Sequence, residues 1–103
     1  MARTPIHPGE ILADELEEIG ISAAQLARTL NVPANRISQI IAGKRAISAD
    51  TALRLARYFG TSADFWMSLQ KTFDLDLARQ EHGKAISHIP QRPTAATPLA
   101  HRA

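Results

Sequence analysis

The sequence predicts an all-α protein, and three observations carry this prediction. Ala, Leu, Glu, Arg and Ile dominate, aromatic residues make up only 5% of the chain, and β-branched residues do not cluster in the alternating runs that strands need. Apolar residues recur at helical spacing in successive segments. Four of the five glycines follow such segments, where a left-handed residue closes a helix. With 103 residues, 45% of them apolar, the chain has enough material for one small core.

The first two helices are expected over residues 8–19 and 23–30. Pro8 suits a first helical position because no amide donor is needed there. Ser22 and Gln25 have the spacing of a capping box at the start of the second helix, and Gly20 ends the first. The residues expected to be buried are Leu12, Leu16 and Ile19 in the first helix and Leu26, Ala27 and Leu30 in the second.

The third and fourth helices are expected over residues 33–42 and 49–59. Pro33 suits the start of the third helix, Ser48 can cap the fourth, and Gly43 and Gly60 follow their ends. The residues expected to be buried are Ile37, Ile40 and Ile41 in the third helix and Ala52, Leu55, Ala56 and Phe59 in the fourth. The spacing of the three isoleucines leaves a polar outer side on the third helix.

The fifth helix is expected over residues 63–82, with Ser62 as its cap and Gly83 at its end. After Gly83 three of the six prolines appear without an acid or a regular apolar period. We therefore expect two parts: a helical domain over residues 1–83 and a basic, proline-containing tail over residues 84–103 that is disordered in isolation.

The chain shows no feature of secretion or of a membrane protein. It has no cysteine, which excludes a disulfide framework, a thiolate metal site and a cysteine nucleophile. The N-terminus lacks the apolar core of a signal peptide, and no run approaches the roughly 18 apolar residues of a membrane span. The sequence thus predicts a cytoplasmic protein without a membrane partner.

Charge is distributed unevenly along the chain. The formal net charge is only +2. Residues 10–18 contain five acids and no base, whereas residues 28–57 contain six bases against a single acid, Asp50. A basic region of this kind is typical of a nucleic-acid-binding surface, because phosphate attraction supplies most of the sequence-independent affinity. An ordinary solvated face is the competing interpretation.

The segment at residues 22–43 has the features of a helix-turn-helix. Ala27 is small where two helices must cross closely, Asn31 tolerates a left-handed turn, and Ile37 packs the second helix onto the first. Together with the basic neighbourhood, these features indicate that the helix at residues 33–42 enters the major groove of DNA.

At this point a family resemblance becomes specific. The motifs HPGEIL at 7–12, LARTLNVPANRISQIIAGKRAIS at 26–48, ADTALRLARYFGTS at 49–62 and FWMSLQKTFDL at 65–75 resemble the HigA-type (VapI-type) antitoxins of the XRE and phage-repressor helix-turn-helix family. The resemblance covers about four fifths of the chain. It implies a five-helix lambda-repressor-like domain that represses its own operon as a homodimer and neutralises a HigB-type toxin, an mRNA endonuclease. Ala23 departs from the family, because many relatives place a phosphate-bracing Gln there.

We predict a DNA-reading surface on and beside the third helix. Asn35 and Gln39 are suited to pair with adenine, Arg36 to read guanine or clamp phosphate, and Lys44 and Arg45 to hold the backbone. We expect the amide end of the second helix to face a phosphate. The full predicted set is Ser22, Ala23, Arg28, Ala34, Asn35, Arg36, Ser38, Gln39, Lys44 and Arg45.

The fifth helix is also the predicted dimer interface, because apolar residues lie on more than one of its sides. The predicted interface residues are Phe65, Trp66, Leu69, Phe73 and Leu77. A two-fold dimer would read the half-sites of a palindromic operator about 34–36 Å apart. The arginines of the fourth helix, Arg54 and Arg57, are expected either near DNA or opposite the acids of the first helix.

An enzyme is not expected. No two of the four histidines have the i, i+4 spacing of a helical metal site, the adjacent Glu17 and Glu18 point to different sides of a helix, and no glycine-rich phosphate loop is present. We therefore expect no cofactor, metal or small-molecule substrate. Two alternatives to the antitoxin stay open: a solitary regulator of the same fold without a toxin, and a helical interaction module that binds no DNA. If a toxin exists, the acidic first helix is one candidate for its docking face.

Overall fold

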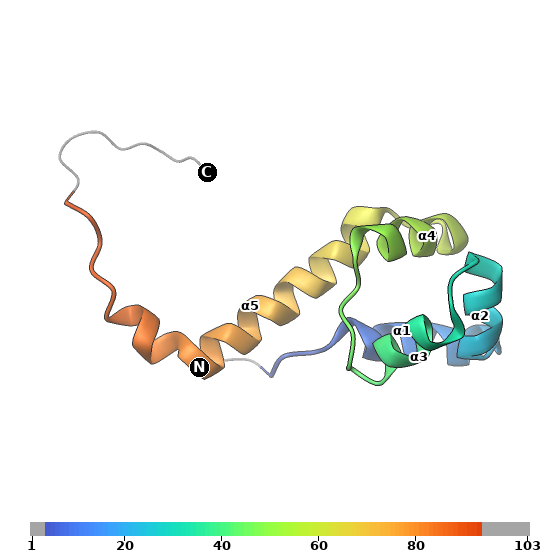
Figure 1. Ribbon diagram of the computed structural model, residues 1–103, viewed down its shortest axis with the longest axis horizontal. Helices are drawn as coiled ribbons and strands as arrows, with labels where there is room; N and C mark the ends of the chain where they lie inside the picture. Colours follow the sequence, from blue (N-terminus) through green and yellow to red (C-terminus); the bar gives the residue numbers. More distant parts are fainter. Residues whose placement is uncertain (1–3, 94–103) are drawn as a thin grey trace.

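The computed structural model describes residues 4–93, which fold into five helices and no strand (Figure 1). The helices are α1 (Pro8–Ile19), α2 (Ala23–Leu30), α3 (Ala34–Ile41), α4 (Ala49–Phe59) and α5 (Ala63–Ser87). The predicted bounds of α1, α2 and α4 are confirmed, and α3 is one residue shorter at each end. The predicted all-α class is therefore confirmed.

Local hydrogen bonds explain where the helices begin and end. Ser22 Oγ accepts from the Gln25 amide at 3.1 Å while Gln25 Oε1 accepts from the Ser22 amide at 2.7 Å, so the predicted capping box is present. Ser48 Oγ and Ser62 Oγ cap α4 and α5 by accepting from the amides of Thr51 and Phe65, without the reciprocal bond. Pro33 is the N-cap of α3 rather than its first helical residue.

The start of α1 has a cap that the sequence prediction missed. His7 Nδ1 accepts from the Gly9 amide at 2.9 Å, and Glu10 Oε2 accepts from the His7 amide at 3.3 Å. The His7 ring also lies edge-on against Phe73 of α5, with 4.8 Å between the ring centroids. His7 therefore both begins α1 and joins it to α5.

The core lies between α1, α2, α3, α4 and the first turns of α5. Its buried apolar residues are Leu12, Leu16, Leu26, Ala27, Leu30, Ile37, Ile40, Ile47, Ala52, Leu55 and Trp66. Gly9 allows α1 to cross the end of α3, because a Cβ there would collide with the Ile40 carbonyl. The N-terminus of α1 thus lies against the C-terminal end of α3.

Ile19 was predicted to be buried, and this prediction is wrong: its side chain is 44% exposed. The chain turns at Gly20, which is left-handed with φ of 74°, and Ile21 packs against the core instead. Ile41, Ala56 and Phe59, also predicted as buried, are only half-buried at the edge of the core.

Helix α5 is longer than predicted. It continues through Gly83 to Ser87, so Gly83 is an interior helical residue and the predicted end at His82 is wrong. A helical glycine costs only about 1 kcal/mol, and Lys84, Ala85 and Ile86 are compatible with a helix. The first four residues of the segment expected to be a disordered tail are therefore helical, and residues 94–103 of that segment lie outside the described residues.

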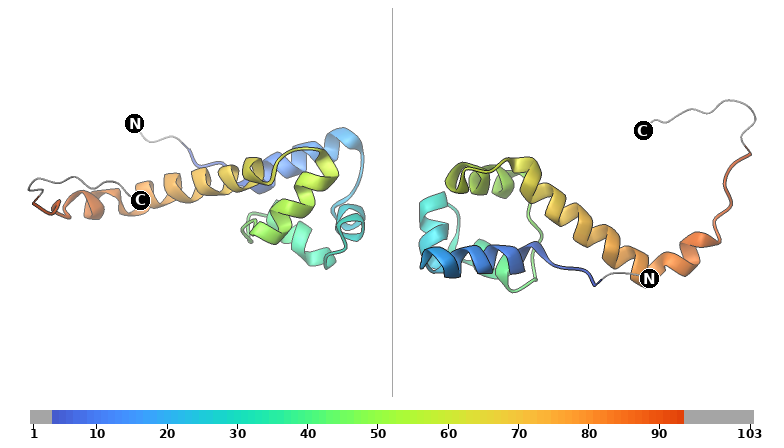
Figure 2. Two further views of the ribbon diagram at one scale, coloured as in Figure 1. Left: turned by 90° about the horizontal axis from the view of Figure 1, so that it is seen from above. Right: turned by 180° about the vertical axis from the view of Figure 1, so that it is seen from behind.

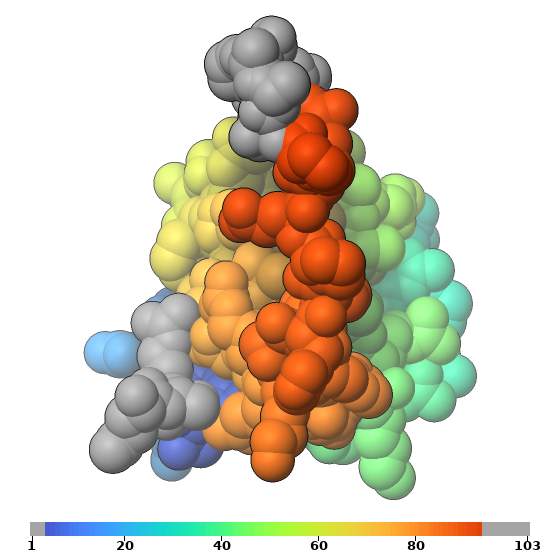
Figure 3. Space-filling model, turned by 90° about the vertical axis from the view of Figure 1, so that its left-hand side faces the viewer, coloured from blue at the N-terminus to red at the C-terminus, as the bar shows by residue number. Residues whose placement is uncertain are grey.

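The molecule is elongated because α5 runs out beyond the other four helices (Figure 2). The extents are 56 × 25 × 21 Å and the radius of gyration is 17.7 Å, against about 13 Å for a compact domain of 100 residues. The view from the end toward which α5 projects shows its C-terminal half uncovered at the front of the molecule (Figure 3). None of the helices described is long and apolar enough to span a membrane.

Candidate nucleic-acid interface

Helices α2 and α3 form the helix-turn-helix. Asn31 closes α2 in the left-handed conformation, with φ of 61°, and the Val32 amide donates to the Ala27 carbonyl at 3.0 Å. Ile37 and Ile40 turn inward, so the opposite side of α3 faces solvent. The predicted turn is confirmed, and the predicted inner face of α3 is confirmed for Ile37 and Ile40.

Asn35 lies on this open side. Its side chain is exposed and makes no hydrogen bond within the described part of the chain, while its carbonyl accepts from Ser38 Oγ at 3.3 Å. Ala34, one residue earlier, is also exposed. The side-chain amide of Asn35 is therefore available to pair with a base edge.

Gln39 lies one turn further along α3 and contacts the loop that follows. Arg45 Nε donates to Gln39 Oε1 at 2.9 Å, and the Lys44 amide donates to the Gln39 carbonyl at 2.8 Å. Two predicted phosphate-binding residues thus lie beside a predicted base reader. Because Arg45 occupies the Gln39 acceptor, pairing of Gln39 with adenine requires Arg45 to turn away or to share that oxygen.

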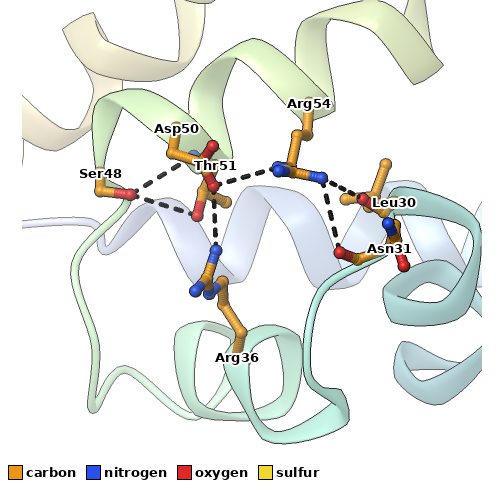
Figure 4. A network of polar contacts seen from close by, with 7 residues as sticks. All are labelled: Leu30, Asn31, Arg36, Ser48, Asp50, Thr51 and Arg54. Carbon is orange, nitrogen blue, oxygen red and sulfur yellow. Dashed lines mark hydrogen bonds and ion pairs between the residues drawn. The ribbon is translucent and has the colours of Figure 1, made fainter.

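Arg36 is held by α4, as Figure 4 shows. Its Nη1 lies 3.0 Å from Asp50 Oδ2, and Arg54 Nε lies 3.0 Å from the same oxygen. The hydrogen bond from Arg54, with the charges of both arginines, lowers the pKa of Asp50. Asp50 therefore stays ionised and holds Arg36 toward α4 in the free protein.

The expectation that the arginines of α4 face the acids of α1 is wrong for Arg54. Its Nη1 donates to the Leu30 carbonyl at 2.7 Å and lies 3.5 Å from the Asn31 carbonyl, both at the C-terminal end of α2 (Figure 4). A guanidinium is favourable at this end because the last carbonyls of a helix lack amide partners. Arg54 therefore fixes α4 against the helix-turn-helix, whereas Arg28 and Arg57 are exposed.

The N-terminal end of α2 offers backbone donors. Ser22 Oγ and the Gln25 side chain are occupied by the capping box, but the amides of Ala23 and Ala24 have no partner in residues 4–93. Such amides bind a phosphate oxygen without any side chain. The half-buried Ala23 side chain packs against the core.

The residues predicted for a dimer interface fall on two different sides of α5. Trp66 is only 1% exposed, and its Nε1 donates to Thr61 Oγ1 at 2.9 Å, so it belongs to the core of its own chain and not to an interface. Leu69, Phe73 and Leu77 are half-buried. Phe65 is exposed, as are Met67, Leu75 and Ile86, which the prediction did not include.

Gln70 is a buried polar residue that the prediction overlooked. Its Oε1 accepts from the Ile47 amide at 2.8 Å, in the loop that carries Lys44 and Arg45. A glutamine at the end of the mostly apolar stretch FWMSLQ was the available signal, because a buried amide needs a specific partner. Asp50 and Arg54 left no such signal, since their pairing depends on the approach of α3 to α4.

Comparisons with known proteins agree with this geometry. The helix-turn-helix family matches residues 12–66. The chain is 51% identical over 86 residues to virulence-associated protein I of Dichelobacter nodosus, covering 82% of this chain and 80% of that protein. It is also similar to the structure of an addiction module antidote protein of the HigA family from Coxiella burnetii, with 47% identity, a TM-score of 0.82 and coverage of 94% and 100% of the two chains. The structure of Pseudomonas aeruginosa antitoxin HigA with the higBA promoter matches with 51% identity, a TM-score of 0.84 and coverage of 88% and 100%.

Proposed function

The chain belongs to the helix-turn-helix family, in its HigA-type antitoxin branch, and we propose that it is a sequence-specific DNA-binding repressor that serves as an antitoxin. The observation that carries this proposal is the open side of α3, where the Asn35 amide, without a partner in residues 4–93, lies on the same helix as Gln39 and its neighbours Lys44 and Arg45. This arrangement combines base-reading amides with backbone-binding cations, as DNA recognition requires.

The contact set of the proposal keeps the ten predicted residues and gives them different roles. Asn35 and Gln39 read bases, and Ala34 and Ser38 lie against the groove. Lys44, Arg45 and the amide end of α2 at Ser22 and Ala23 bind phosphates, with Arg28 adding general attraction. Arg36 contributes only if Asp50 releases it.

A titration with DNA tests the proposal. Duplex DNA from upstream of the gene for this chain is compared with a scrambled duplex at two salt concentrations. The proposal expects preference for the upstream duplex by a factor of about 10³ or more, with affinity falling steeply as salt rises. Equal binding to both duplexes, or none at low salt, would refute it and favour the interaction module.

We further propose that the repressor is a homodimer joined through α5. Met67, Leu75 and Ile86 are exposed apolar residues of α5. Their spacings of 8 and 11 residues place them within about 100° of one another around the helix. Apolar residues on one exposed side of a helix favour pairing with a second copy.

Toxin neutralisation is the second part of the proposed role. Relatives with the fold include a named antidote protein and a named antitoxin. The test is co-purification of this chain with the product of a small gene beside its own. Joint purification supports the antitoxin, while the absence of such a gene would leave a solitary regulator.

Charge reversal at Glu15 and Glu18, both exposed on α1, tests whether the acidic helix α1 binds the toxin. Unchanged capture of the toxin would exclude α1 as the docking face.

The proposed role is one of binding and not of catalysis. Residues 4–93 contain no group of three or more histidines, aspartates and glutamates that could hold a metal ion. A repressor of an operon acts where the genomic DNA lies, so we place the protein in the cytoplasm.

A further inference from the structure

The loop between α3 and α4, residues 42–48, is fixed at both ends. At its start the Gly43 amide donates to the Ile40 carbonyl at 3.0 Å and the Lys44 amide donates to the Gln39 carbonyl at 2.8 Å. At its end the Ile47 side chain is buried in the core. The exposed Lys44 lies at the first fixed point and the exposed Arg45 lies between the two, so their position depends on both.

The second fixed point includes a hydrogen bond from α5. Gln70 is only 6% exposed, and its Oε1 accepts from the Ile47 amide at 2.8 Å in a buried bond between residues 23 positions apart. Its Nε2 donates to Asp74 Oδ1 at 3.0 Å. A backbone amide only donates hydrogen bonds, so Ile47 requires the oxygen of the Gln70 amide and leaves its nitrogen for the Asp74 carboxylate. The orientation of the Gln70 side chain is thus determined by chemistry.

We propose that Gln70 is a positioning residue for DNA binding: it fixes the α3–α4 loop, with Lys44 and Arg45, relative to α5. This inference rests on the proposed function. It links DNA binding to dimerisation, because α5 is the proposed dimer helix. In a two-fold dimer, both loops must meet phosphates at separations set by the duplex. A loop held by the dimer helix needs little further ordering when it binds.

The decisive variant is Gln70→Met, which keeps a side chain of similar length and removes the acceptor for the Ile47 amide. We expect about tenfold weaker binding to the upstream duplex. The dependence of log K on log salt should also become less steep, by about 0.9 for each phosphate that the loop no longer neutralises. A comparably destabilised core variant, Leu16→Ala, is the matched control, and its salt dependence should not change when both are measured well below their melting temperatures.

A double-mutant cycle separates positioning from general stability. Gln70→Met is measured again in the background Lys44→Ala, Arg45→Ala, at low salt so that binding stays measurable. If Gln70 acts through the loop, its tenfold effect disappears in this background, because the cations it positions are absent. An effect of equal size in both backgrounds would overturn the proposal.

A rescue variant tests the hydrogen bond itself. In Gln70→Glu, Asp74→Asn, a carboxylate oxygen still accepts from the Ile47 amide and the new amide at position 74 donates to it. This exchange should restore the affinity and salt dependence of the original chain to within about threefold. Failure to restore either one, in a folded protein, would contradict a role for this bond.

Asp74→Ala is the deciding variant if Gln70→Met does not fold. Asp74 is exposed, so its removal releases the Gln70 amide without opening the core. We expect a twofold to fivefold loss of affinity, and no such loss in the background that lacks Lys44 and Arg45. Unchanged binding would overturn the inference. Lack of binding by the original chain would instead refute the proposed function.

Discussion

Single residues divide the proposed DNA surface into readers and anchors. Asn35 presents an unpaired amide, whereas Gln39 shares its oxygen with Arg45 in the free protein. Lys44 donates to Gln39 only through its backbone, so its ammonium is left for phosphate. Reading and anchoring should therefore respond differently to substitution.

Loss of a reader should reduce discrimination, and loss of an anchor should reduce affinity for every sequence. Asn35→Ala or Gln39→Ala should cost about 1–3 kcal/mol of preference at one base pair. Lys44→Ala should weaken binding to all duplexes alike and reduce the salt slope by about 1. Titrations of operator duplexes with single base changes, repeated on scrambled DNA, measure both effects. Identical profiles for the three variants would disprove this division.

Two glycines provide a matched test of the packing at α1. Gly9→Ala should destabilise the fold by about 1–3 kcal/mol, because the new methyl group collides with the Ile40 carbonyl at the end of α3. Gly83→Ala should stabilise it by about 0.5–1 kcal/mol, because Gly83 is an interior helical residue with open space around it. Chemical denaturation measures both changes. Equal effects would contradict the close approach of α1 to α3.

At the scale of elements, the sequence predicted those features that depend on local chemistry. The serine caps, the glycine ends of α1 and α4 and the left-handed Asn31 were predictable, because each depends on residues a few positions apart. The end of α5 was not predictable in this way, because Gly83 was interpreted as a helix end although it is an interior residue of α5. The hydrogen bonds from Arg54 to the Leu30 carbonyl and from the Ile47 amide to Gln70 also could not be predicted. Each joins residues 23 or 24 positions apart in the chain.

The junction of α1 and α5 should weaken with acid. Burial lowers the pKa of His7 below its ordinary value of 6.5, while the charges of Asp74 and Glu10 oppose this shift. The unfolded chain therefore takes up a proton first as pH falls, so the free energy of unfolding should decrease below about pH 6.5. His7→Asn keeps a capping side chain and removes the titration. Melting temperatures measured between about pH 7.5 and 5.5 should depend less on pH for this variant. An unchanged dependence would exclude His7 as the cause.

At the scale of the whole molecule, the projection of α5 creates a surface that the other helices do not cover (Figure 3). The predicted interface was placed on the wrong side for Trp66, because apolar periodicity alone does not distinguish a core stripe from an outer one. The predicted helical fold required only the apolar residues of α5 that face the core. Met67, Leu75 and Ile86 form a second, outer stripe on its exposed side. The sequence showed apolar residues on more than one side of α5, but only the structure shows which side packs inward.

Substitution on the outer stripe should dissociate the dimer. Leu75, 45% exposed on α5, is replaced in Leu75→Glu, which brings two charges into the proposed interface. Sedimentation should show a shift from dimer to monomer, and binding to a duplex with two half-sites should weaken by at least about tenfold. Leu53→Glu places the same charge on an exposed leucine of α4 and should leave the dimer intact. Equal behaviour of the two variants would contradict dimerisation through α5.

The most direct test of the DNA-reading role is a residue-by-residue map of the surface that a duplex touches. Backbone amide resonances of the 103-residue chain are followed by NMR as the upstream duplex is added. We expect the largest shifts at the start of α2, along α3 and in residues 42–48, with smaller ones on α1. Shifts confined to α1 or α4, with α3 unchanged, would show that the isoleucine-backed helix does not face DNA.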